Sequence, residues 1–596
     1  MRLSVLNSEA SFLAAIGPSR VLRLRWIWLL SVCLPLLSGV SAAQVQFRFV
    51  SPLLKVHPDQ PPVNSVAKWR VSTATGEIES AQILISGEAG RALDSVSLEA
   101  IVPAGSPFQI ELSLVGFVKT VEGDRRPWAK QEGKGYVGWW PDPLLPNRPF
   151  SVAAGEVQPV WVNVKTPHGA KPGDYKFQLA IRSAGKQWNA ECDVTIWDVE
   201  VPAKQYYRNA AFLPPGNLSA YYQPEGGIAG DRFFEIYKKW VRKSFDQHLG
   251  PTFDMMMGWN GIAVRTPETS GPLGPTGEMI VGTGNGQMVW PVQGKTGDYD
   301  FSRVDELGAI GHEYGMRQYA IAIFDRERSY REMPQVERDQ MAGLLRAYSE
   351  HLRKQGRLEE AYVYNVDEPP EKQWDTVKEN YRFVKSVVPD LNTWLCLNQP
   401  KAVKELAPYT DILDVYIRQY DSSKAEEVRQ SGKQVIWAVC VWPHEHPNLF
   451  IEYPGADARV IGWLTYRYGI TGFEYWGLNQ WGDNVHNRDW ANFKEGATRT
   501  TWKRTKWPWG DGWLLYPGPD GAPLSSLRFE NLRDGFEEAE LLHLLAESGA
   551  KAEADALAKR IADSIESYET DPAKFAAARA ELLERLSKLR GPRSKN

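Results

Sequence analysis

The sequence predicts an α/β fold: a (β/α)8 barrel preceded by an all-β sandwich domain and followed by C-terminal helices. Three observations support this prediction. Short apolar segments alternate with helical stretches from about residue 205, only strand-like segments come before that point, and helical periodicity fills the chain after residue 513. A chain of 596 residues is also long enough for two or three domains. We therefore divide it into residues 1–43, 44–203, 204–512 and 513–596.

Residues 1–43 are typical of a secretory signal peptide. Arg20, Arg23 and Arg25 precede the apolar run 26–37, and the small residues Ser41-Ala-Ala43 form a cleavage site. The apolar run is shorter than the about 20 residues that cross a bilayer. We expect an exported protein, periplasmic or extracellular, with no membrane span in the mature chain.

Residues 44–203 predict a β-sandwich accessory domain. Strand-like segments are separated by turns rich in Gly and Pro, such as Pro172-Gly-Asp174. The clearest segments are 45–50, 80–86, 159–164, 175–181 and 193–199.

Residues 204–512 predict the barrel because apolar strands and helices alternate there. The expected strands are 210–213, 252–257, 319–324, 362–366, 393–397, 412–417, 435–441 and 472–476. The expected helices are 232–248, 303–314, 335–354, 371–387, 402–406, 423–431 and 456–468. Residues 513–596 then predict further helices, either a small appended bundle or a hairpin that closes the barrel.

The composition narrows the class of ligand. A formal charge of -4 gives no basic surface for nucleic acid. The chain is 12% aromatic, with 24 Trp and 24 Tyr, and such rings suit the C–H faces and hydroxyl rims of sugars. Ordinary buried core aromatics remain the alternative for any single ring.

The mature chain keeps Cys192, Cys396 and Cys440, which form neither a disulfide framework nor a zinc pattern. We expect no metal and no cofactor.

The most informative segment is Tyr362-Val-Tyr-Asn-Val-Asp-Glu-Pro-Pro370, an apolar strand that ends in two adjacent carboxylates. In a (β/α) barrel, the carboxyl ends of the strands hold the catalytic residues. Paired carboxylates suit glycoside hydrolysis, in which one acid protonates the leaving oxygen. Asp367 and Glu368 can share a pocket only if the backbone leaves strand geometry there. The alternative is that Asp, Glu and Pro simply begin the following helix.

Other strand ends provide candidate sugar-binding residues. Tyr416 and Tyr420 lie around the end of the sixth expected strand, and Trp442 ends the seventh. Trp476 and Asn479 follow the eighth, where an aromatic floor and an amide would bind the apolar face and a hydroxyl of a sugar. For each aromatic residue, a place in the barrel core is the alternative.

Several motifs, in this order along the chain, resemble glycoside hydrolase family 123. They are Gly76-Glu-Ile-Glu-Ser-Ala-Gln82, the segments 447–454 and 457–463, Gly472-Phe-Glu-Tyr-Trp-Gly-Leu-Asn-Gln-Trp481, Leu515-Tyr-Pro-Gly518 and Ser526-Leu-Arg-Phe-Glu-Asn-Leu-Arg-Asp-Gly535. The resemblance covers roughly residues 60–545.

This resemblance implies a retaining exo-hydrolase of β-linked N-acetylgalactosamine that uses the acetamido group of its substrate as the nucleophile. It implies Glu368 as general acid/base and Asp367 as the residue that orients the acetamido group and stabilises an oxazolinium-like intermediate. The partner would be a glycan or glycoconjugate. Two alternatives stay open: an exo-glycosidase with another sugar specificity, and a non-catalytic carbohydrate-binding protein.

Overall fold

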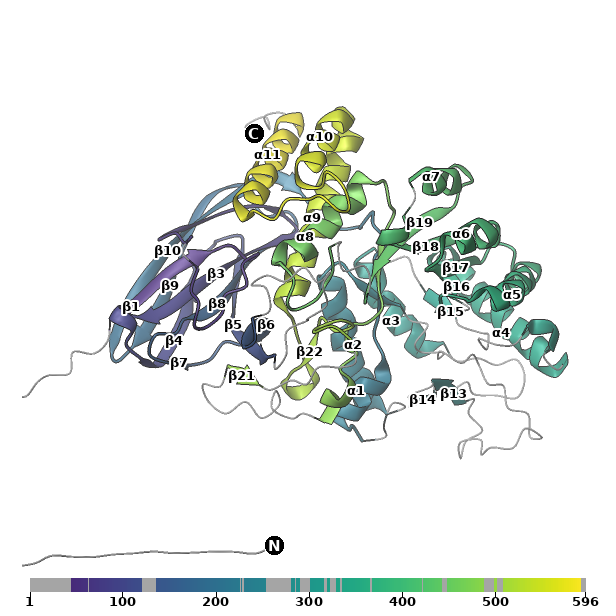
Figure 1. Ribbon diagram of the computed structural model, residues 1–596, viewed down its shortest axis with the longest axis horizontal. Helices are drawn as coiled ribbons and strands as arrows, with labels where there is room; N and C mark the ends of the chain where they lie inside the picture. The colour runs from purple at the N-terminus through teal and green to yellow at the C-terminus, as the bar shows by residue number, and fades with distance from the viewer. Residues whose placement is uncertain are drawn as a thin grey trace, which may run out of the picture. The chain divides into compact units, whose positions relative to one another are not determined.

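The computed structural model describes residues 44–590, except 63, 121–135, 226, 228–229, 253–279, 284–285, 290–300, 316–318, 322–328, 333–334, 365–366, 421, 442–446, 487–497 and 501–506. Two sandwich-like sheets occupy its N-terminal part (Figure 1). One sheet has the order β1 (Val45–Val50), β3 (Glu77–Gly87), β8 (Gln158–Thr166), β5 (Gln109–Lys119) and β21 (Arg499–Thr500), with β6 (Trp139–Pro146) also paired to β5. The other has the order β2 (Trp69–Thr75), β10 (Lys186–Glu200), β9 (Gly173–Ser183), β4 (Leu93–Ile101) and β7 (Phe150–Val152).

One strand of the first sheet comes from far along the chain. Arg499 and Thr500 pair in parallel with Phe117 and Val118 of β5. The sequence analysis did not anticipate this strand, because a two-residue segment carries no periodic signal.

Seven of the strands expected from residue 205 onward are present at their places, while residues 253–257 of the expected strand 252–257 lie outside the described residues and a strand is seen at 250–252. These eight strands form one sheet in which every described pair is parallel. Its order is β12 (Gly250–Thr252), β11 (Ala210–Phe212), β20 (Phe473–Tyr475), β19 (Gln434–Val439), β18 (Ile412–Tyr416), β17 (Asn392–Leu397), β16 (Ala361–Tyr364) and β15 (Tyr319–Ile321). This is the strand order of a (β/α)8 barrel opened between its second and third strands. Among the described residues β12 and β15 do not pair, so the structure gives a half-barrel sheet rather than a closed barrel.

Helices follow most of these strands, as the alternating pattern predicts (Figure 1). They are α1 (Pro215–Tyr222), α2 (Asp231–Asp246), α3 (Ser302–Glu313), α4 (Gln335–Lys354), α5 (Trp374–Val387), α6 (Pro400–Leu406), α7 (Ser422–Gln430) and α8 (Gly455–Arg467). The C-terminal helices are α9 (Leu527–Leu545), α10 (Lys551–Ile561) and α11 (Pro572–Arg590). Over the described ranges, the helices are too short or too polar to cross a membrane.

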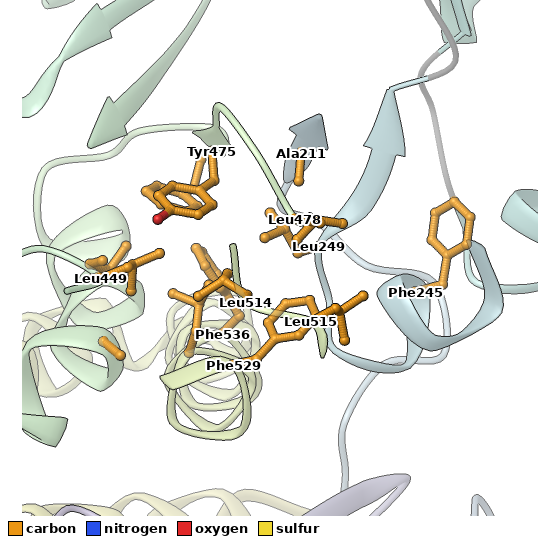
Figure 2. Close-up of a cluster of buried hydrophobic side chains, with 14 of the residues drawn as sticks. Ala211, Phe245, Leu249, Leu449, Tyr475, Leu478, Leu514, Leu515, Phe529 and Phe536 are labelled. Carbon is orange, nitrogen blue, oxygen red and sulfur yellow. The ribbon is translucent and has the colours of Figure 1, made fainter. Parts of the chain in front are cut away.

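Helix α9 is a central element of the core and not an exposed appendage. Its residues are buried on all sides, including seven charged ones, and Phe529 and Phe536 pack in a cluster with Tyr475 of β20 (Figure 2). The helix crosses α8 at two glycines: a Cβ on Gly462 would lie 2.0 Å from the carbonyl oxygen of Gly535. Only glycine permits this approach of the two backbones.

The buried charges of α9 are paired with residues of other elements. Arg459 of α8 donates to Glu538 at 2.6 Å, and Arg579 of α11 pairs with Glu77 and Glu79 of β3. Arg533 pairs with Asp534 and lies 3.0 Å from the Ser80 hydroxyl of β3. Buried charges are tolerated only when they are paired in this way. The ion cluster therefore ties the first sandwich sheet to the C-terminal helices.

Candidate active site

The two faces of the parallel sheet differ in character. Ala210, Tyr362, Trp394, Ile412 and Ile436 form a small hydrophobic cluster that is separate from the main core. These residues come from five strands, and they mark one face of the sheet, which we call the inner face. Because side chains alternate along a strand, the residue two positions further along each strand also lies on this face. That rule places Tyr364, Cys396, Asp414 and Ala438 above the cluster, toward the carboxyl ends of the strands.

Asp367 is held by a phenol from the inner face. The Tyr364 hydroxyl donates to Oδ1 of Asp367 at 2.8 Å. Burial, together with the negative charge of Asp367, raises the pKa of Tyr364 well above its usual value, so the phenol stays a neutral donor. The carboxylate is thereby fixed just past the end of β16.

Glu368 has a left-handed backbone, with φ of 48°. This conformation is uncommon for a residue that carries a Cβ, and it costs on the order of 1 kcal/mol or more. The Glu368 N–H donates to the carbonyl of Cys396 at 3.2 Å, and Asn398 donates its side-chain amide to Oε2 of Glu368 at 3.0 Å. The chain thus leaves strand geometry at this residue, as a shared pocket for both carboxylates requires.

A third carboxyl group, that of Asp414 in β18, lies on the same face. Asp414 is 0% exposed; Trp394 Nε1 donates to its Oδ2 at 3.3 Å, and its Oδ1 has no hydrogen-bond partner in the described part of the chain. Burial and the charges of Asp367 and Glu368 raise its pKa to about 8. Asp414 is therefore a neutral acid at neutral pH.

Tyr416 reaches the same region from the end of β18. Its hydroxyl oxygen accepts from the Cys440 thiol at 3.0 Å. Burial raises the pKa of Tyr416 far above its usual value, and the thiols of Cys440 and Cys396 and the charge of Glu368 add to the shift. The phenol proton is therefore retained, and the Cys440 sulfur is the group beside it. Tyr416 can donate that proton to a carbonyl or hydroxyl of a ligand.

Trp476 is half-buried just after β20. Its indole N–H donates to Asp511 at 2.9 Å, and its ring meets Trp507 edge-on with 6.1 Å between centroids. A side chain on Gly512 would collide with the ring, since its Cβ would lie 2.4 Å from Trp476. Trp476 is thus a fixed, partly exposed ring. Trp442, the other expected ring, lies outside the described residues.

Two expected site residues are placed elsewhere. The chain makes a 3-10 turn over Ile417–Gln419, and this turn carries Tyr420 to the helical side of the sheet. There the Tyr420 hydroxyl donates to the carbonyl of Tyr468 at 3.2 Å, and the Tyr420 ring packs on Trp437. Asn479 is 0% exposed and donates its side-chain amide to the carbonyl of Pro214 at 2.9 Å. In the described part of the chain, these hydrogen bonds join both side chains to backbone carbonyls and not to Asp367 or Glu368.

Sequence reasoning missed three polar residues of this face: Asn398, Asp414 and Glu474. Glu474 is the sheet partner of Ala438 and adds a negative charge near Tyr364 and Cys396. The signal was available, because Asp414 and Glu474 each lie two residues before an expected site residue, Tyr416 or Trp476.

Two further observations concern other kinds of site. In the described ranges no group of three His, Cys, Asp or Glu residues is arranged to hold a metal ion. A cavity of about 590 Å³ opens on the sandwich, lined by Phe47 and Trp188 among others. Its single acid, Glu191, is within ion-pair distance of Lys68. That cavity has no carboxylate pair, so the chemistry points to the sheet end and not to the sandwich.

Comparisons with known proteins agree with this architecture. The family model for the glycoside hydrolase 123 catalytic domain matches residues 335–545, and the model for the glycoside hydrolase 123 N-terminal domain matches residues 55–183. A family 123 glycoside hydrolase from Clostridium perfringens aligns over 92% of this chain and 98% of its own, with 13% identity and a TM-score of 0.63. A search of curated proteins finds no match.

Two further solved structures are much less similar. A GH10 xylanase from termite gut has a TM-score of 0.29 at 10% identity, over 79% of this chain and 99% of its own. A β-glucuronidase from Bacteroides uniformis has a TM-score of 0.24 at 10% identity, over 72% of this chain and 45% of its own. These two scores are too low to establish a shared fold. The family models, in contrast, identify the protein as a glycoside hydrolase. The chain belongs to glycoside hydrolase family 123.

Proposed function

We propose that the protein is an exo-acting β-N-acetylgalactosaminidase that works with retention and uses the acetamido group of its substrate as the nucleophile. One observation carries this proposal: Asp367 and Glu368 are adjacent at the end of β16, and each is held by its own donor, Tyr364 for Asp367 and Asn398 for Glu368. The two neighbouring carboxylates are thus fixed separately. Two separate roles follow, one for each acid.

In the first step, the acetamido carbonyl oxygen attacks the anomeric carbon while the glycosidic C–O bond breaks. Glu368 gives its proton to the leaving oxygen. Asp367 accepts a hydrogen bond from the acetamido N–H and stabilises the positive charge of the oxazolinium ring. An internal nucleophile is favoured because it is already positioned next to the anomeric carbon. In the second step, Glu368 takes a proton from a water molecule while the water oxygen attacks the anomeric carbon. The bond from that carbon to the acetamido oxygen breaks, so the oxazolinium ring opens and the original anomeric configuration is restored.

The substrate would be held by groups around these two acids. Tyr416 retains a phenol proton that it can donate to the acetamido carbonyl, and Trp476 offers a partly exposed ring for the apolar face of the sugar. Trp442 stays a candidate at the end of β19. The likeness to the Clostridium perfringens enzyme, whose structure was analysed for glycolipid glycan hydrolysis, supports a glycan or glycoconjugate as substrate.

Two coarser features are part of the same proposal. We infer that β12 and β15 close the sheet into a (β/α)8 barrel, because their places in the strand order are those of neighbours in such a barrel. We also infer that residues 1–43 act as a signal peptide and that the enzyme works in the periplasm or outside the cell. N-terminal sequencing of protein secreted by the native host tests the second inference. A mature chain beginning near Gln44 is expected, and an intact Met1 would contradict it.

Glu368→Gln tests the assignment of the acid. Turnover of a β-N-acetylgalactosaminide is expected to fall by on the order of 100-fold or more, with the protein still folded. Glu371→Gln is the matched control, because Glu371 lies three residues further on, is exposed, and pairs with Lys401 at 2.5 Å among the described residues. It should leave turnover unchanged. Near-normal turnover by Glu368→Gln would remove Glu368 from the mechanism.

A further inference from the structure

Asp414 is a buried carboxyl group, and the described groups that act on it include no cation. It lies on β18, opposite Cys396 of β17 on one side and Ile436 of β19 on the other, and it is 0% exposed. The groups that act on it are the acids Asp367 and Glu368, the indole of Trp394 and the thiol of Cys396. Within the described ranges, the other titratable groups of this face are phenols, a thiol and an acid: Tyr364, Tyr416, Cys440 and Glu474.

The hydrogen bonds of Asp414 do not compensate an ionised form. A carboxylate accepts up to about four hydrogen bonds, yet Oδ1 of Asp414 has no partner among the described residues and Oδ2 accepts one long bond from Trp394, at 3.3 Å. The Cys396 thiol is a further donor beside the carboxyl group, but a weak one. A buried carboxylate without a cation and with an unused oxygen is strongly disfavoured. A neutral carboxylic acid fits the same surroundings at much lower cost.

The position of Asp414 connects it to the proposed catalytic pair. Cys396 is the sheet partner of Asp414, and its backbone carbonyl accepts a hydrogen bond from the N–H of Glu368. Tyr364, on the same face, donates a hydrogen bond to Asp367. A third negative charge at this place would repel both acids through a region that contains little water. It would disfavour the state in which Asp367 is ionised and ready to accept the acetamido N–H.

We propose that Asp414 is a positioning residue that works as a neutral carboxylic acid, and that its ionisation in alkaline solution disables the site formed by Asp367 and Glu368. This proposal rests on the proposed function, since it assumes that those two residues are the catalytic pair. It adds a third acid whose charge state, and not its contact with substrate, limits the reaction.

The test compares wild type with Asp414→Asn, which has nearly the same shape and cannot ionise. The ratio of kcat/KM for the variant to that for wild type, with a chromogenic β-N-acetylgalactosaminide, is measured from about pH 5.5 to about pH 9.5. We expect the ratio to be constant at low pH and to rise by about fivefold or more as the pH passes about 8, where only wild type gains the extra charge. Titration of Glu368 occurs in both proteins and cancels from the ratio to a first approximation.

Thermal unfolding gives a second readout that needs no turnover. The native state holds a proton on Asp414 that the unfolded chain releases, so wild type loses stability as the pH rises from 3.8, the ordinary pKa, to about 8. The Tm of Asp414→Asn minus the Tm of wild type should therefore increase over this range and level off above it. If Asp414→Asn does not fold, Asp414→Leu, also unable to ionise, takes its place in both experiments.

Asp411→Asn is the matched control. Asp411 lies at the other end of the same strand and its carboxylate binds Lys385 at 2.7 Å. Its activity ratio should be flat across the same pH range. A flat or falling ratio for Asp414→Asn would overturn the positioning role, and a Tm difference that does not change with pH would overturn the neutral acid. Failure of the proposed function looks different, because wild type itself would then not turn over the substrate.

Discussion

The hydroxyl of Tyr364 donates a hydrogen bond of 2.8 Å to Asp367, three residues further along the chain. Tyr364 is the last residue of β16, so the sheet itself fixes the donor. Asp367 follows where the chain turns away from the strand. This relationship explains how a carboxylate on a loop is held in one orientation, which a residue that must orient an acetamido group requires.

Replacing Tyr364 by Phe removes this donor and keeps the ring. We expect kcat for a β-N-acetylgalactosaminide to fall by about tenfold, because a hydrogen bond to a charged group is worth about 1.5–3 kcal/mol. Tyr314→Phe is the control, since that phenol also donates to an aspartate, Asp246, at 2.6 Å, but between α3 and α2. Equal losses in the two variants would show that the effect is not specific to the site.

The left-handed backbone of Glu368 predicts that a substitution which relieves its strain raises the free energy of unfolding while activity is lost. Glu368→Gly and Glu368→Ala both remove the carboxylate, and both should be inactive. Only glycine relieves the strain of φ at 48°, so Glu368→Gly should unfold at higher denaturant concentration than Glu368→Ala, by about 1 kcal/mol. Chemical denaturation of the two variants measures the difference. A more stable alanine variant would show that the conformation carries no strain.

The buried ion cluster predicts a large loss of stability from a single change. Arg459→Met should destabilise the protein by about 3–5 kcal/mol, because the buried Glu538 loses its 2.6 Å ion pair and keeps the more distant Arg579, at 3.9 Å. Arg585→Met is the control: Arg585 also pairs with two glutamates, but in a partly exposed position on α11, and should cost about 1 kcal/mol or less. Urea unfolding compares the two. Similar losses would contradict the assignment of a special role to the buried cluster.

His248 predicts a loss of stability in acid. Burial, with the positive charge of Arg533, lowers its pKa from 6.5 to about 3. Below pH 6.5 the imidazole of His248 is therefore protonated in the unfolded chain but still neutral in the native state. The free energy of unfolding falls as the pH drops from 6.5 toward 3. His248→Asn removes this titration and suits the left-handed φ of 57°. Its Tm should decrease less than that of wild type over this range, and parallel decreases would contradict the prediction.

The sequence predicted the parallel strands well because each is a short apolar run between helical stretches. Asp367 and Glu368 were proposed as the catalytic pair because they stand at the end of such a run. The sequence also predicted a closed barrel, but the described ranges contain no pairing between β12 and β15 that would close it.

The remaining site residues show where sequence reasoning reaches its limit. Asp414 was overlooked because one acid inside Ile412-Leu-Asp-Val-Tyr416 does not interrupt an apolar strand. Tyr420 and Asn479 were expected in the pocket because both follow a strand end, but the direction of a side chain there depends on the turn and no longer alternates. Their actual partners, Tyr468 and Pro214, are distant in the sequence.

The most direct test of the central claim is turnover of three chromogenic substrates side by side: a β-N-acetylgalactosaminide, a β-N-acetylglucosaminide and a β-galactoside. Substrate-assisted hydrolysis with Asp367 and Glu368 predicts release from the N-acetylgalactosaminide and none from the plain galactoside, which has no acetamido nucleophile. Release from the N-acetylglucosaminide in its place would keep the mechanism and change the sugar. Comparable release from the β-galactoside would contradict the account.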